Sequence, residues 1–170
     1  MPAGATYEPL ATTTLSTATS SVTFSSISGS YTDLVVIVNS SQATTGTYSS
    51  YIQLNGDTGN NYSRIMLYGT GSAAGSALQS TNPSMYLGTW NATQSSTDRQ
   101  VLIINFNNYS NTTTYKTMLG RYNVAGVEVG AGVGTWRNTA AITSINLASG
   151  SGANNFASGS TFTLFGIKAA

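Results

Sequence analysis

Short runs in which apolar and polar residues alternate follow one another along the whole chain. Turn-forming residues separate these runs, and no apolar periodicity of helical length interrupts them. Alternation with a period of two is typical of antiparallel sheets, in which one face of each strand is buried. We therefore predict an all-β fold of about ten short strands, an antiparallel β-sandwich of jelly-roll type.

Two segments differ from this pattern because their apolar residues are consecutive. Gln100–Phe106 reads Gln-Val-Leu-Ile-Ile-Asn-Phe, and Leu34–Val38 is an uninterrupted apolar run. Continuous runs of this length, bounded by polar turn formers, are typical of strands buried on both faces. We expect the two segments to be partners in the middle of the core.

The turn signals define the other elements. Asn55-Gly56-Asp57 is the strongest, because Asn and Gly tolerate the positive φ angles of a tight hairpin. Gly69–Gly75 is predicted to be a loop, and the alternating glycines Gly130, Gly132 and Gly134 indicate a bulge or a close approach to the backbone. Further strands are predicted at Leu10–Leu15, Ser21–Phe24, Tyr48–Leu54, Tyr62–Tyr68, Met85–Trp90, Tyr115–Tyr122, Val127–Val133, Ala141–Leu147 and Thr161–Ile167.

A chain of 170 residues is expected to form one domain. Residues 1–9, with Pro2, Tyr7 and Pro9, have no period and are predicted to be an extended arm, either frayed or reaching a neighbouring subunit. Residues 10–170 would then form the sandwich.

Composition excludes several kinds of chemistry. The chain has no Cys and no His, which excludes thiol catalysis, His acid–base catalysis and the usual zinc ligand sets. Only 6% of its residues are charged and the net charge is +1, so no basic face for nucleic acid is expected. No apolar run approaches the length of a membrane span, so no membrane partner is expected. A net charge near zero favours association between subunits.

The acidic residues do not suggest a catalytic pair, because all five are far apart in the sequence. Asp57-Thr-Gly59-Asn-Asn61 has oxygen ligands for Ca²⁺, although a hairpin turn explains the same residues. We therefore predict no enzymatic activity, no catalytic or metal site and no cofactor.

Aromatic residues and prolines are the candidates for intermolecular contact. Amphipathic rings suit a subunit interface or a sugar-binding platform, and they also suit the packing of a core. The predicted interface residues are Pro2, Tyr7, Pro9, Tyr48, Trp90, Tyr109 and Trp136.

Several motifs together carry a family resemblance. They are residues 7–15 (Tyr-Glu-Pro-Leu-Ala-Thr-Thr-Thr-Leu), 22–27, 31–35, 54–63 (Leu-Asn-Gly-Asp-Thr-Gly-Asn-Asn-Tyr-Ser) and the closing 159–167. Over nearly its whole length the chain resembles a family of small all-β proteins encoded by tailed bacteriophages and taken to be virion structural proteins.

The resemblance implies a location on the surface of the phage particle and one of two roles. The first is a capsid decoration (cement) protein, a homo-oligomer such as a trimer that clamps neighbouring major capsid proteins or other virion proteins. The second is a tail fibre or spike head that binds a host-surface glycan. The short chain, which begins at its own Met1 and has no repetitive shaft, favours the first role.

Overall fold

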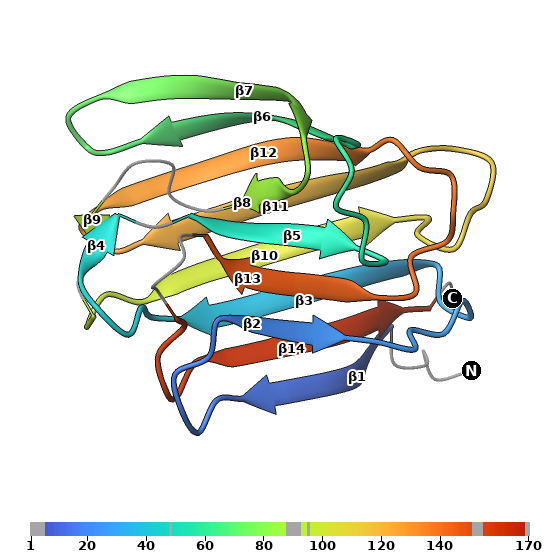
Figure 1. Cartoon of the computed structure of the whole chain (residues 1–170), viewed down its shortest axis with the longest axis horizontal. Helices are drawn as coiled ribbons and strands as arrows, with labels where there is room; N and C mark the ends of the chain where they lie inside the picture. Colours follow the sequence, from blue (N-terminus) through green and yellow to red (C-terminus); the bar gives the residue numbers. More distant parts are fainter. Residues whose placement is uncertain (1–5, 48, 88–92, 95, 151–154, 169–170) are drawn as a thin grey trace.

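The structure is a computed structural model that describes residues 6–47, 49–87, 93–94, 96–150 and 155–168. Its strands form a large sheet, a small sheet and a separate two-stranded pair (Figure 1). The large sheet has the order β1 (Tyr7–Thr14), β14 (Thr161–Ile167), β3 (Asp33–Ser40), β10 (Gln100–Asn107), β11 (Lys116–Val124), β12 (Glu128–Trp136), β6 (Tyr62–Gly69) and β7 (Ala74–Asn82). The small sheet has the order β2 (Ser21–Phe24), β13 (Ile145–Ser149), β5 (Ser50–Leu54) and β8 (Met85–Leu87), and β4 (Gly46–Thr47) pairs with β9 (Thr93–Gln94).

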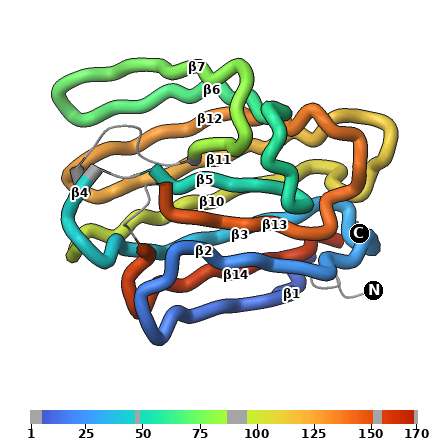
Figure 2. The backbone as a smooth tube through the Cα atoms, in the orientation of Figure 1, coloured from blue at the N-terminus to red at the C-terminus, as the bar shows by residue number. Residues whose placement is uncertain are grey.

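The prediction of an all-β antiparallel sandwich is confirmed. Every strand pairing in the two sheets is antiparallel, and the chain passes repeatedly between the large and the small sheet as it winds around the core (Figure 2). Within the described residues there is no helix long and apolar enough to cross a membrane.

The strands β3 and β10 are neighbours at the centre of the large sheet, as the sequence predicts. Their register pairs Leu102 with Val38 and Ile104 with Val36, and all four side chains are buried between the sheets. The expectation that β10 is buried on both faces is wrong, because its burial alternates and Ile103 is only half-buried. None of the described elements packs over the opposite face of this strand.

The glycines of β12 lie on the face that points into the core. The register of β12 with β11 is continuous, so these glycines do not mark a bulge. A Cβ at Gly130 would lie 2.6 Å from the ring of Tyr122, and one at Gly134 would lie 1.8 Å from the sulfur of Met85. The alternative of a close approach is therefore correct, because large side chains occupy the space above the glycine backbone.

The turn between β5 and β6 forms at the residues that the sequence indicates. Asn55 has a φ of 52° and Gly56 a φ of 69°, both in the left-handed region. The expectation of a hairpin is wrong, because the turn carries the chain from β5 in the small sheet to β6 in the large sheet. β5 pairs with β13, and β6 pairs with β12.

Two differences from the predicted boundaries lie at the two edges of the large sheet. The sequence does not predict β7, because Ala-Gly-Ser-Ala has little β-propensity and the strand forms only by pairing with β6 at the sheet edge. The predicted arm is shorter than nine residues, since β1 begins at Tyr7 and pairs there with Ile167. The positions before residue 6 lie outside the described residues.

Candidate interaction face

The large sheet has one face directed away from the small sheet, called here the outer face, and it carries an unusual number of exposed aliphatic side chains. These belong to four neighbouring strands, β11, β12, β6 and β7. They are Ile65, Leu67, Leu78, Leu119, Val129 and Val133, which together are called the aliphatic patch. Contiguous exposed apolar surface of this kind is typical of interaction sites.

Strand register places four members of the patch in one line across the sheet. Leu78 pairs with Ile65, Ile65 with Val133, and Val133 with Leu119. Their exposed fractions are 69%, 57%, 43% and 51%, respectively. Directly opposite residues in antiparallel strands have Cβ atoms only about 5 Å apart, so the line forms a continuous aliphatic ridge.

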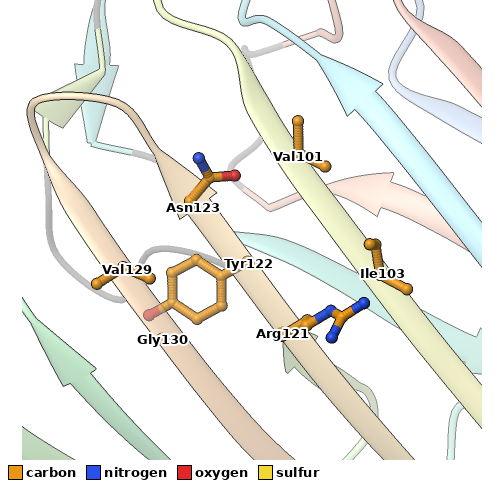
Figure 3. A pocket seen from close by; sticks show the side chains of 7 residues that line it. All are labelled: Val101, Ile103, Arg121, Tyr122, Asn123, Val129 and Gly130. Atoms are coloured by element: carbon orange, nitrogen blue, oxygen red, sulfur yellow. The ribbon is translucent and has the colours of Figure 1, made fainter.

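Among the described outward-facing positions of β10, β11, β12, β6 and β7, one side chain is charged, that of Arg121 on β11. Its register partners are Ile103 on β10 and Ala131 on β12, and it is exposed. Beside it lies a hollow of about 220 Å³, whose lining includes Arg121, Val101, Ile103 and Val129 (Figure 3). The outer face therefore combines an aliphatic ridge with one guanidinium group at a mostly apolar hollow.

Buried polar side chains lie on the other, inner face of the same strands. The hydroxyl of Tyr122 donates a hydrogen bond to Glu128 Oε1, and Arg64 Nε donates to Gln79 Oε1 at 2.9 Å. Burial lowers the pKa of Arg64 to about 10 and, together with the hydrogen bond to Glu128, raises the pKa of Tyr122 above its ordinary value. These contacts pair buried polar groups with one another inside the fold, and they support a structural role.

The carboxylate of Asp57 binds three N–H donors of its own chain. Oδ2 accepts from Trp136 Nε1 at 2.7 Å and from Asn61 Nδ2 at 2.8 Å, and Oδ1 accepts from the Gly59 backbone N–H at 2.8 Å. Burial raises the pKa of Asp57, but these hydrogen bonds outweigh it and lower the pKa below its ordinary value. Both oxygens accept hydrogen bonds at the turn, which favours a structural turn over the Ca²⁺ site. The described residues contain no cluster of three or more His, Cys, Asp or Glu side chains that could hold a metal ion.

The predicted interface residues are not brought together. Tyr7 and Pro9 are exposed on the edge strand β1, where the Tyr7 ring packs edge-to-face with Phe165 at 6.2 Å. Tyr109 and Trp136 are buried, so their prediction as interface residues is wrong. The Tyr109 hydroxyl donates to the Ser28 carbonyl, and Trp136 stacks on Tyr62. The other three, Pro2, Tyr48 and Trp90, lie outside the described residues.

The aliphatic patch was not predicted from the sequence, because the apolar residues of an ordinary half-buried strand face the core, whereas those of β12 face outward. Val129 and Val133 face outward while the glycines between them face the core. On β6, the consecutive apolar residues Ile65, Met66 and Leu67 offered a signal, because an alternating strand must then expose some of them.

The comparisons with known proteins add little to this description. No family model matches the chain, and no curated protein matches it. Among solved structures, galectin LEC-6 of Caenorhabditis elegans is 10% identical, with 89% of this chain and 94% of that chain covered and a TM-score of 0.36. The PL-14 alginate lyase of Aplysia kurodai is 9% identical, with coverages of 83% and 70% and a TM-score of 0.29. With TM-scores this low, neither likeness informs the candidate site.

Proposed function

We propose that this protein is a structural, non-enzymatic component of a tailed-phage particle, a capsid decoration protein that binds other virion proteins through the aliphatic patch. The observation that carries the proposal is the ridge of Leu78, Ile65, Val133 and Leu119 across four strands of the outer face. The resemblance to virion structural proteins supports the choice of partner.

The size of the outer face supports a protein partner. Eight strands spaced about 4.8 Å apart span roughly 34 Å, and strands of seven to nine residues are roughly 26 Å long. The face therefore covers on the order of 900 Å², while each partner in a standard protein–protein interface buries about 800 Å². The outer face is therefore large enough for one such contact.

The chemistry of the face supports a protein more than a glycan. Sugar-binding platforms use aromatic rings, whereas the patch is aliphatic. Among the described residues the exposed aromatic side chains are Tyr7 and Tyr115, which belong to β1 and to the segment before β11. Four strand spacings separate these two strands, about 19 Å, so the two rings do not form one platform.

The proposed mechanism is adhesive. Each copy buries aliphatic surface against a capsid subunit, and many copies around one shell multiply a modest affinity for a single site. As part of the same proposal the protein acts as a homo-oligomer, a trimer on the local symmetry axes. A net charge of +1 limits repulsion between neighbouring copies.

Electron cryo-microscopy of the particle that carries this protein tests the proposal. We expect its density on the head surface, with the outer face against capsid subunits; density at the tail tip would contradict the decoration role. In a second arm, purified protein is added to heads that lack it. The double variant Ile65→Thr/Leu119→Thr should lose occupancy, and Tyr7→Ser, which removes an exposed ring at the far edge, should keep it.

A further inference from the structure

Arg121 has an environment that a surface arginine rarely has. It is the one charged side chain among the outward-facing positions of β10, β11, β12, β6 and β7, which are all within the described residues. Arg121 lies opposite Ile103 of β10 and opposite Ala131 of β12, and Ala131 in turn lies opposite Leu67 of β6. None of the described residues makes a hydrogen bond or an ion pair with its guanidinium group.

The hollow beside Arg121 is mostly apolar, and Asn123 is a polar residue in its lining. Val101, Ile103 and Val129 contribute side chains to its lining, and Arg121 lies next to Ile103 at its side (Figure 3). Its volume is about 220 Å³. An apolar cavity of about 150 Å³ holds a benzene molecule, so this hollow has room for one ring or one branched aliphatic side chain.

A partner that covers the aliphatic patch necessarily removes water from Arg121. A buried charge without a counter-ion is strongly unfavourable, and the flat guanidinium fork is best satisfied by a carboxylate that accepts two parallel hydrogen bonds. We therefore propose that the outer face binds a protein segment in which an Asp or Glu lies beside a large apolar residue. The carboxylate pairs with Arg121 and the apolar side chain enters the hollow.

The acids of the chain itself argue for a different protein as the partner. Glu8 forms an ion pair with Lys168, Glu128 is buried against Tyr122, and Asp57 binds three donors of its own chain. The remaining acids lie at the beginning of β3 and in the turn before β10, away from the middle of the outer face. A second copy therefore offers no acid in the middle of the surface that would face Arg121.

Selection from a random dodecapeptide library against the immobilised protein tests this inference. We expect enriched peptides to carry Asp or Glu next to Leu, Ile or Phe. Their affinity should fall at least about tenfold for Arg121→Gln and stay closer to that of the wild type for Arg121→Lys. Asn146→Asp is the matched control: it makes the same change of charge on the outer surface of the small sheet, where Asn146 contacts Thr23, and should bind normally.

The inference would be overturned if no peptide is enriched, if the enriched peptides lack an acid, or if they bind Arg121→Gln as well as the wild type. Self-association that is lost in both Arg121→Gln and Asp33→Asn would also overturn it, in favour of a second copy. Circular dichroism melting curves establish that each variant is folded. The inference rests on the proposed use of the outer face, but its test needs no particle, so a tail location would contradict only the decoration role.

Discussion

Replacing Trp136 by Phe tests whether the contact between Asp57 and Trp136 holds the turn between β5 and β6 to the end of β12. Trp136 is buried, its indole N–H donates to Asp57 Oδ2 at 2.7 Å, and its ring stacks on Tyr62. This contact fixes the end of the pairing between β12 and β6, where Trp136 is opposite Tyr62. Three positions along the same pairing, Val133 is opposite Ile65. The ridge on the outer face therefore depends on this contact.

The expected loss of stability has two parts. A hydrogen bond to a charged acceptor contributes about 1.5–3 kcal/mol. Removing the second ring of a buried indole adds about 1–2 kcal/mol for lost burial and the remaining cavity. Trp136→Phe should therefore lower the free energy of unfolding by about 2.5–5 kcal/mol, which is a large share of the roughly 5–15 kcal/mol of a typical domain.

Urea denaturation followed by circular dichroism measures this loss, and a double-mutant cycle isolates the hydrogen bond. The cycle combines Trp136→Phe with Asp57→Ala, and we expect a coupling energy of about 1.5–3 kcal/mol. Tyr115→Phe, at an exposed position, is the control and should change stability by less than about 0.5 kcal/mol. A loss below about 1 kcal/mol for Trp136→Phe, or a coupling within error of zero, would refute the reasoning.

Three further predictions concern the core and its titrating groups. Burial raises the pKa of Tyr62 to about 12. The contribution of the neutral hydroxyl to stability is therefore complete below the unfolded-state pKa of about 10 and is lost as the pH rises toward 12. Urea titrations between these pH values should show a fall in the free energy of unfolding, and the fall should be smaller in Tyr62→Phe. The pKa of Asp57 is lowered, so the contribution of its carboxylate to stability is complete above the unfolded-state pKa of about 3.9 and is lost at more acidic pH. Below this pH the free energy of unfolding of the wild type should fall more steeply than that of Asp57→Asn. Equal slopes in urea titrations would contradict this. Gly130→Ala places a methyl group 2.6 Å from the ring of Tyr122 and should destabilise by about 1–3 kcal/mol, whereas Gly69→Ala, with its nearest neighbour at 3.8 Å, should have a much smaller effect in thermal melts.

The periodicity of the sequence was sufficient to locate most of the strands. Ser21–Phe24 and Thr161–Ile167 are strands with the predicted boundaries, and Asn55-Gly56 forms the predicted turn. The pairing of Leu34–Val38 with the Gln100 strand is also as predicted. These features depend on local propensities and on long apolar runs, which a single sequence contains. The strand Ala74–Asn82 has neither signal, so only its pairing with β6 reveals it.

The candidate site was not accessible to the same reasoning. A period of two divides a strand into two faces, but it does not say which face another sheet will cover. On β12 the glycines face the core because Tyr122 and Met85 need the space above them, and Val129 and Val133 are consequently exposed.

The sequence by itself determined that the chain is a β-sandwich without Cys or His chemistry, since alternation and composition are properties of the chain alone. The tertiary structure decided which apolar residues remain at the surface. It buried Tyr109 and Trp136, which the sequence favoured as contact residues, and it aligned Leu78, Ile65, Val133 and Leu119 on the outer face. The physical reason is that exposure depends on the register between strands distant in sequence and on which face of the large sheet the small sheet covers.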